Sequence, residues 1–147
     1  MKLSTKMRYG TRAMVDLALA YPTKALSVKE LSQSQYLSIK YLEQIMAALK
    51  AGGLVKVVRG VHGGYTLARD PGTIRLIEVF EPLEGALSLV DCVGDPSVCE
   101  RRDGCVTWEV WSEMTKALEK VLERTTVQDL VERKKQKSNS RMFIYHI

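Results

Sequence analysis

The sequence predicts a mostly α-helical chain that contains one small β-hairpin followed by a long helix. Three observations support this fold class. Apolar residues recur at three- and four-residue spacing along most of the 147-residue chain, as in amphipathic helices. Serine stands as a capping residue before several of these stretches. A β-branched run at 54–59 is followed by a glycine-rich tip and a shorter run at 65–68, which predicts two antiparallel strands.

The composition indicates a globular chain, long enough for one domain with a real core or for one small domain plus a dimerisation extension. Hydrophobic residues make up 46% of it, and 22 Lys and Arg against 17 Asp and Glu give a net charge of +5. This excess suits a polyanionic partner, but many soluble proteins share it. No apolar run is long enough to cross a membrane, and residues 1–12 show no secretion segment. We therefore expect no membrane association and a cytoplasmic location.

The first two helices have clear start and stop signals. A helix from about Thr5 to Tyr21 is expected to end before Pro22, which cannot continue it. Ser27 and Glu30 stand three residues apart and form a capping box, in which each side chain satisfies the other residue's backbone N–H. The capping box begins a short second helix.

A turn at Tyr36 and Leu37 leads to a third helix, which Ser38 caps and Gly52 ends. Helix, short turn and helix is the order of a helix-turn-helix unit, whose second helix reads the DNA major groove with its N-terminal residues. An ordinary helical hairpin would show the same pattern. Lysine can donate to guanine, glutamine can pair with adenine, and glutamate can accept from cytosine. The candidate DNA-binding residues on this helix are Ser38, Lys40, Tyr41, Glu43 and Gln44.

The hairpin at 54–68 directly follows the helix-turn-helix, and this succession predicts a winged helix. Arg59 lies at the shoulder of the wing, where it can meet phosphate or enter the minor groove. The glycines of the tip at 60–64 allow the backbone to approach DNA closely. His62 is expected to be a solvent-exposed residue of this mobile tip.

The chain is predicted to divide into four regions. Residues 1–82 form a winged helix-turn-helix DNA-binding domain, whose last helix Thr73 is expected to cap. Residues 83–105 form a cysteine loop, residues 106–133 form dimerisation helices, and residues 134–147 form a C-terminal tail. A heptad seam on the long helix predicts a homodimer, although folding back onto the head is the alternative. The seam consists of Trp111, Met114, Leu118, Val121 and Thr125.

All three cysteines lie in the loop, at Cys92, Cys99 and Cys105. An odd number of thiols without a secretion segment favours metal ligands or redox sensors over structural disulfides. No Cys-x-x-Cys pair is present, so the spacing is not that of a zinc ribbon. Neighbouring arginines would favour the thiolate. An iron–sulfur cluster, a thiol redox switch, zinc and inert cysteines remain open from the residues alone.

Enzymatic activity is not expected. The chain has two histidines, no paired carboxylates in an apolar setting and no nucleophile motif. The glycines at 60–64 lead into a strand rather than a helix, so they lack the setting of a phosphate-binding loop.

Four stretches together give a resemblance that covers nearly the whole chain. They are MKLSTKMRYG at the start, SIKYLEQI at 38–45, RGVHGGYTLA at 59–68, and the cysteine loop running into CVTWEVW at 105–111. The sequence resembles the Rrf2 family of bacterial transcription regulators, and within it the iron–sulfur cluster regulator branch. This resemblance implies a homodimer that binds a palindromic operator in double-stranded DNA through residues 38–44 and Arg59.

The resemblance also implies that the three cysteines hold an iron–sulfur cluster, [2Fe-2S] in the first place and [4Fe-4S] as the alternative. The fourth ligand stays open. The family's best-known member has a histidine three residues after the third cysteine, where this chain has Trp108. Other members use an acidic side chain near the partner's N-terminus, where this chain has Arg8. The expected function is a transcriptional repressor controlled by the cluster, and the alternative is a cluster-free regulator controlled by thiol oxidation or a partner protein.

Overall fold

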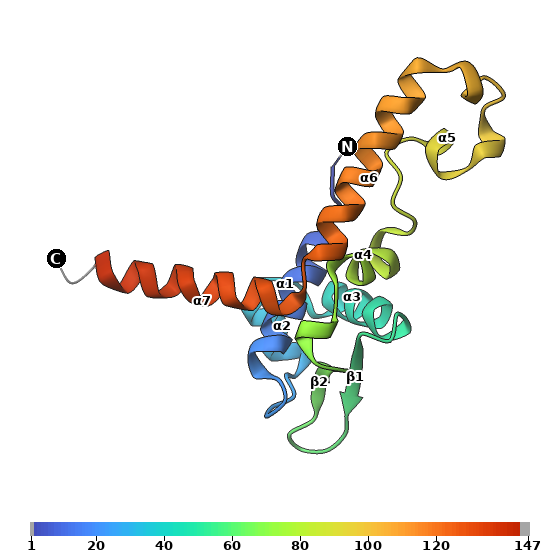
Figure 1. Ribbon diagram of the computed structural model, residues 1–147. Helices are drawn as coiled ribbons and strands as arrows, with labels where there is room; N and C mark the ends of the chain where they lie inside the picture. The colour runs from blue at the N-terminus through green and yellow to red at the C-terminus, as the bar shows by residue number, and fades with distance from the viewer. Residues whose placement is uncertain (1, 145–147) are drawn as a thin grey trace.

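The computed structural model describes residues 2–144 and has a helical head from which a hairpin and two long helices project (Figure 1). The mostly α-helical class with a two-stranded hairpin is confirmed. The elements of the head are α1 Thr5–Ala20, α2 Val28–Gln35, α3 Ile39–Ala51, β1 Val55–Val58, β2 Gly64–Leu67 and α4 Leu76–Glu84. The elements that follow are α5 Asp91–Gly94, α6 Val106–Arg124 and α7 Val127–Ile144. Single 3-10 turns are η1 Pro71–Thr73, η2 Pro96–Val98 and η3 Arg102–Gly104.

One hydrophobic core holds the head together. Helix α1 lies at its centre and packs against α2, α3, α4, β2 and α7. Gly10 lies where α1 approaches α4 closely, and a Cβ there would lie 2.5 Å from Cδ1 of Leu83, so that the leucine side chain would have to shift. The largest fully buried side chains come from the helices of the head, from strand β2 and its neighbouring connections, and from the start of α7: Met14, Leu17, Leu31, Leu42, Ile45, Met46, Leu49, Leu54, Leu67, Ile74, Val79 and Val127.

The start of α4 differs from the expectation that Thr73 caps this helix. Asp70 instead forms a 3-10 turn, in which its side chain accepts from the Gly72 N–H at 2.7 Å and its carbonyl accepts from the Thr73 hydroxyl at 2.7 Å. The Thr73 hydroxyl is thereby used in the turn. Helix α4 begins two residues later, where Glu78 accepts from the Arg75 N–H at 2.9 Å.

Helix α7 begins inside the head and ends far from it. Val127 and Val131 are buried in the core, and the Val127 N–H donates to the Ile74 carbonyl at 2.9 Å. The expected end near Arg133 is wrong, because α7 continues to Ile144. No proline or glycine occurs after residue 133 to stop it. Residues 145–147 of the predicted tail lie outside the described residues.

Helix α6 projects away from the head and carries the cysteine loop at its far end (Figure 1). Its apolar seam is largely uncovered within one chain: Trp111, Met114 and Val121 are 39%, 47% and 44% exposed. Leu118 is half-buried, and Thr125 is buried at the junction with α7. The helix therefore does not fold back with this seam as core of its own head.

Candidate functional site: nucleic-acid interface and cysteine loop

The connection between α2 and α3 is fixed by local hydrogen bonds. The capping box is present, with Ser27 N–H to Glu30 Oε2 at 2.8 Å and Glu30 N–H to Ser27 Oγ at 3.2 Å. In the turn, the Leu37 N–H donates to the Ser32 carbonyl at 3.1 Å and the Ser32 hydroxyl donates to the Leu37 carbonyl at 2.5 Å. These bonds set the angle at which α3 leaves the turn.

Tyr36 lies in this turn and is unusual in both conformation and exposure. Its φ of 54° places it in the left-handed region, which a residue with a Cβ rarely adopts. Its side chain is 93% exposed. The sequence indicated only a turn here, because no local signal distinguishes this tyrosine from an ordinary turn residue.

The outer face of α3 presents most of the predicted DNA-binding residues. Leu42, Ile45, Met46 and Leu49 are fully buried, which fixes the inner face. The opposite side is free of packing within the described chain. It carries Lys40, Glu43 and Gln44 as exposed residues, with Ser38 exposed at the cap.

Tyr41 lies apart from that outer face. Its hydroxyl forms a 2.9 Å hydrogen bond with the Thr5 hydroxyl, and its ring meets the Tyr9 ring edge-on with 6.4 Å between centroids. The Ser38 side chain caps α3, because it accepts a hydrogen bond from the Tyr41 N–H at 3.2 Å. The structure therefore joins Tyr41 to α1 and leaves Lys40, Glu43 and Gln44 as the outward-facing members of the set.

The wing is held to the helix-turn-helix by a third extended segment. Strands β1 and β2 pair antiparallel, with Val55 opposite Leu67. Leu26 and Tyr65 exchange N–H to carbonyl bonds of 2.9 and 2.8 Å, which ties the wing to the residues just before α2. Arg59 follows β1 directly and is exposed, as are the tip residues Val61 and His62. The wing and α3 are therefore packed into one head, since β1 also contacts α3.

In the cysteine loop, the side chain of Trp108 links the segment that carries Cys92 to the start of α6, which Cys105 caps. Cys92 lies on α5, Cys99 follows η2, and Cys105 caps α6; all three are free and half-buried. The Trp108 indole N–H donates to the Cys92 carbonyl at 3.0 Å. The guanidinium of Arg102 lies 4.5 Å from the centre of the Trp108 ring, close enough for a cation–π contact.

The environment of Cys105 favours its thiolate. The Thr107 hydroxyl lies 3.2 Å from the sulfur. This hydrogen bond, and then that of the Trp108 N–H, holds the pKa of the Cys105 thiol below its usual range. A thiolate is the form that binds metal and attacks electrophiles.

The donor chemistry of three thiols fits an iron–sulfur cluster, but the arrangement is not that of a formed site. In residues 2–144, no three His, Cys, Asp or Glu side chains gather as a group that could hold a metal ion. Trp108 cannot act as a ligand, because its indole nitrogen is a donor only. Asp95 accepts from the Ser97 N–H and hydroxyl at 2.8 and 2.7 Å, which lowers its pKa and commits the carboxylate to its own turn. The structure thus supplies three sulfur donors, and neither Trp108 nor Asp95 is available to join them.

Within the described part of the chain, none of the helices has the length and apolar character required to span a membrane.

Comparisons with known proteins agree with this architecture. The family model described as "Rrf2: Iron-dependent Transcriptional regulator" matches residues 3–133. Protein rrf2 of Nitratidesulfovibrio vulgaris is 36% identical over 131 residues, which cover 89% of this chain and 87% of that protein. The transcriptional regulator CymR of Bacillus subtilis is 38% identical over 130 residues, covering 88% and 89%.

Solved structures give the same relationship. CymR, described as the global cysteine regulator of B. subtilis, aligns with a TM-score of 0.76 over 90% of this chain and 98% of its own, at 35% identity. T. potens IscR aligns with a TM-score of 0.74 over 90% and 88%, at 38% identity. The family model and CymR are named as regulators of transcription and not as enzymes, and the chain belongs to the Rrf2 family of transcriptional regulators.

Proposed function

We propose that the protein is a homodimeric repressor that binds a palindromic DNA operator, with an affinity set by an iron–sulfur cluster on Cys92, Cys99 and Cys105. The observation that carries the proposal is the position of the cysteine loop. All three thiols lie between α4, the last helix of the predicted DNA-binding domain, and the long helix α6. A structural change in this loop would therefore act on the connection between the DNA-binding head and α6, and so on the orientation of the two heads in a dimer.

The exposed seam of α6 supports the dimer. Apolar side chains that remain 39–47% exposed on one helix face favour association with a second copy. A twofold dimer presents two recognition helices, so its operator should be palindromic, with half-sites about 34 Å apart or a multiple of that spacing.

The cluster is supported by the donor set and by the family. Three cysteine thiols, of which Cys105 has a lowered pKa, are the kind of ligand that iron–sulfur clusters use, [2Fe-2S] first and [4Fe-4S] as the alternative. Bound in the loop, the cluster would supply a redox-sensitive link between α5 and the start of α6. The chain's own residues Trp108 and Thr107 would position the two segments that carry Cys92 and Cys105.

A second candidate is a cluster-free regulator controlled by thiol oxidation or a partner protein. The lowered pKa of the Cys105 thiol favours it, because a thiolate reacts readily with oxidants. CymR, which is described as a cysteine regulator, resembles this chain as closely as IscR does.

Anaerobic purification separates the two candidates. The cluster proposal expects coloured protein with stoichiometric iron and sulfide, and operator affinity that differs about five- to hundredfold between loaded and metal-free protein. The variant in which all three cysteines are replaced by serine should be colourless, and its operator affinity should not change on cluster reconstitution. Colourless protein that accepts no cluster on reconstitution, with an affinity that follows oxidant, favours the thiol switch instead.

The dimer is tested separately by sedimentation. Met114→Glu places a charge in the exposed seam and should yield monomers, whereas Lys116→Glu on another part of the helix should remain dimeric. Monomeric unmodified protein would contradict the proposal.

A further inference from the structure

Tyr36 belongs neither to the cysteine loop nor to the predicted DNA-binding set. It is the C-cap residue of α2 and stands two residues before Ser38, the N-cap of α3. It therefore lies in the turn of the helix-turn-helix, directly before the helix that is predicted to read DNA.

The backbone conformation of Tyr36 is unfavourable for a residue with a side chain. Its φ of 54° and ψ of 45° lie in the left-handed region. There the Cβ comes too close to the following carbonyl oxygen, and glycine or asparagine adopts this conformation more readily. Packing of the ring in its own chain could offset the cost, but the residue is 93% exposed. Tyrosine at this position therefore destabilises the turn without a gain in packing, and such strain is typical of functional sites.

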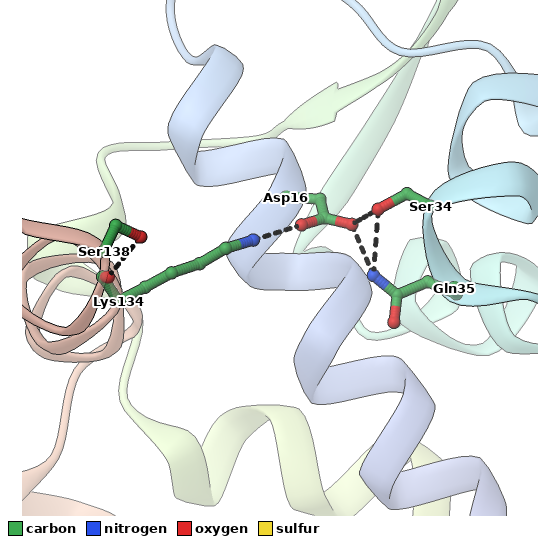
Figure 2. Close-up of polar contacts among 5 residues, drawn as sticks. All are labelled: Asp16, Ser34, Gln35, Lys134 and Ser138. Carbon is green, nitrogen blue, oxygen red and sulfur yellow. Dashed lines mark hydrogen bonds and ion pairs between the residues drawn. The ribbon is translucent and has the colours of Figure 1, made fainter. Parts of the chain in front are cut away.

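The residues on both sides of Tyr36 are fixed by the head. Gln35 is 4% exposed, and its Nε2 donates to Oδ2 of Asp16 (Figure 2). Leu37 packs against the core, and its N–H donates to the Ser32 carbonyl at 3.1 Å. Because both neighbours are fixed, the Cα–Cβ bond of Tyr36 has one direction, and the exposed ring extends from the turn into solvent.

The surroundings of this turn suit an anionic partner. Residues 31–42 include no Asp or Glu, and Lys40 is exposed in the first turn of α3. The Asp16 carboxylate, which contacts the end of α2, is 8% exposed and pairs with Lys134 Nζ at 2.9 Å. A phosphate group that approached Tyr36 would therefore meet no exposed carboxylate from residues 31–42.

The position of the turn identifies the partner. A recognition helix enters the major groove with its N-terminal end, and the phosphate backbone runs along the edge of that groove. The turn before α3 should therefore lie at the backbone when Lys40 and Gln44 reach the bases. Tyrosine hydroxyls are among the groups that bind phosphate oxygens in protein–DNA complexes, and such contacts fix the register of the protein on the duplex.

We propose that Tyr36 is a DNA backbone contact, whose hydroxyl donates a hydrogen bond to a phosphate oxygen at the edge of the major groove. The contact holds the start of α3 in register with the bases. It rests on the proposed DNA-binding function and adds to it a residue that positions the recognition helix. The ring then contributes to DNA affinity and not to folding.

Fluorescence anisotropy with the full-length, metal-free protein tests the contact. The probes are an operator recovered by selection from a random duplex library and an unrelated duplex of equal length at low salt. Tyr36→Phe should weaken binding to both about three- to tenfold, the loss expected for one hydrogen bond. Tyr36→Gly and Tyr36→Asn suit the left-handed turn but remove the ring, and they should weaken binding at least as much. Leu19→Ala, which shortens a 43% exposed side chain of α1, should leave the affinity unchanged.

The salt dependence separates this contact from those of the cations. Tyrosine is uncharged, so its loss releases no counterion, and the slope of log affinity against log salt should be the same in the Tyr36 variants and the unchanged protein. Arg59→Ala should reduce that slope in the same experiment. Thermal melts check folding, and the glycine and asparagine variants should melt no lower than the unchanged protein.

Four outcomes would contradict the proposal. A phenylalanine variant that binds as tightly as the unchanged protein overturns the hydroxyl contact. Weakening at particular base pairs alone would make Tyr36 a base reader, and lower melting of the glycine and asparagine variants would show that the ring supports the fold. If the unchanged protein binds no duplex, the proposed function itself fails, whereas equal binding by all variants overturns this inference alone.

Discussion

The Trp108 indole N–H donates a 3.0 Å hydrogen bond to the carbonyl oxygen of Cys92, 16 residues earlier in the chain. This bond closes the cysteine loop on itself, because Cys92 lies on α5 and Trp108 lies in the first turn of α6. Trp108, which stands where the resemblance led us to look for a histidine ligand, thus links the two ends of the loop.

Replacing Trp108 with phenylalanine keeps an aromatic ring but removes this donor. We expect a loss of about 0.5–1.5 kcal/mol of stability in the loop. The metal-free variant should also show faster alkylation of Cys92, measured by mass spectrometry. Trp111→Phe is the matched control, since Trp111 lies on the exposed seam of the same helix. Equal alkylation rates in both variants would show that the bond does not restrain the loop.

The thiol of Cys105 should react at lower pH than an ordinary cysteine. Its pKa is lowered mainly by the Thr107 hydroxyl, so the thiolate persists below the usual range. Thr107→Val removes that hydrogen bond and should move the pH dependence of Cys105 alkylation to higher pH in metal-free protein. The profile of Cys99 in the same sample provides the internal control. An unchanged Cys105 profile would rule out Thr107 as the cause.

Local signals in the sequence predicted helix starts such as those of α2 and α3, and the wing. Contacts between residues far apart in the sequence could not be predicted from it. Ser27, Glu30 and Ser38 act as expected because a cap depends only on residues within one turn. The pairing of Asp16 with Lys134 joins residues 118 apart and left no pattern in the sequence. The hydrogen bond between the Tyr41 and Thr5 hydroxyls likewise left no pattern in the sequence. Tyr41 lies near the start of α3, where residues that read DNA are expected, but its hydroxyl is engaged by Thr5.

Two elements of the structure differ from what the sequence predicted, the start of α4 and the length of α7. Thr73 looked like a helix cap because Ile74 begins an apolar stretch, but Asp70 captures its hydroxyl in a 3-10 turn. The length of α7 was missed because its residues 134–140 are polar and offer no apolar face in their own chain. Helix propensity continues there without an amphipathic pattern.

The capping box should make the stability of the head depend on acid. The pKa of Glu30 is lowered from 4.5 to about 2, first by its bond with Lys24 and then by Ser27. Because the folded pKa is depressed, this contribution is complete above pH 4.5 and is lost as the pH falls toward 2. The melting temperature of Glu30→Gln should therefore lie below that of the unchanged protein at pH 7, and the gap should close between these values. A gap that does not change with pH would contradict the assignment.

Tyr36 offers a test of strain in the helix-turn-helix. The left-handed conformation costs a residue with a Cβ about 1–2 kcal/mol, and glycine recovers most of this while losing about 0.5–1 kcal/mol to chain entropy. Tyr36→Gly should therefore raise the free energy of unfolding by about 0.5–1 kcal/mol, whereas Tyr36→Ala should leave it nearly unchanged. Denaturant titration measures both, and a destabilised glycine variant would show that the tyrosine ring supports the fold.

The two kinds of DNA contact should separate in binding experiments. Gln44 is exposed on the outer face of α3, where a bidentate bond to adenine is worth about 1–3 kcal/mol of discrimination. Gln44→Ala should therefore relax the preference at one base pair of each half-site.

Arg59 lies on the wing shoulder, and Arg59→Ala should weaken binding to all sequences alike. It should also reduce the salt slope by about one for each phosphate that the arginine no longer neutralises. Fluorescence anisotropy against the operator and single-base variants, at several salt concentrations, measures both effects. Ala47→Ser, on the same exposed face, is the control for the helix surface. If Gln44→Ala weakens all sequences equally, α3 does not read bases through this residue, and if Arg59→Ala changes only one base preference, the wing enters a groove instead of contacting the backbone.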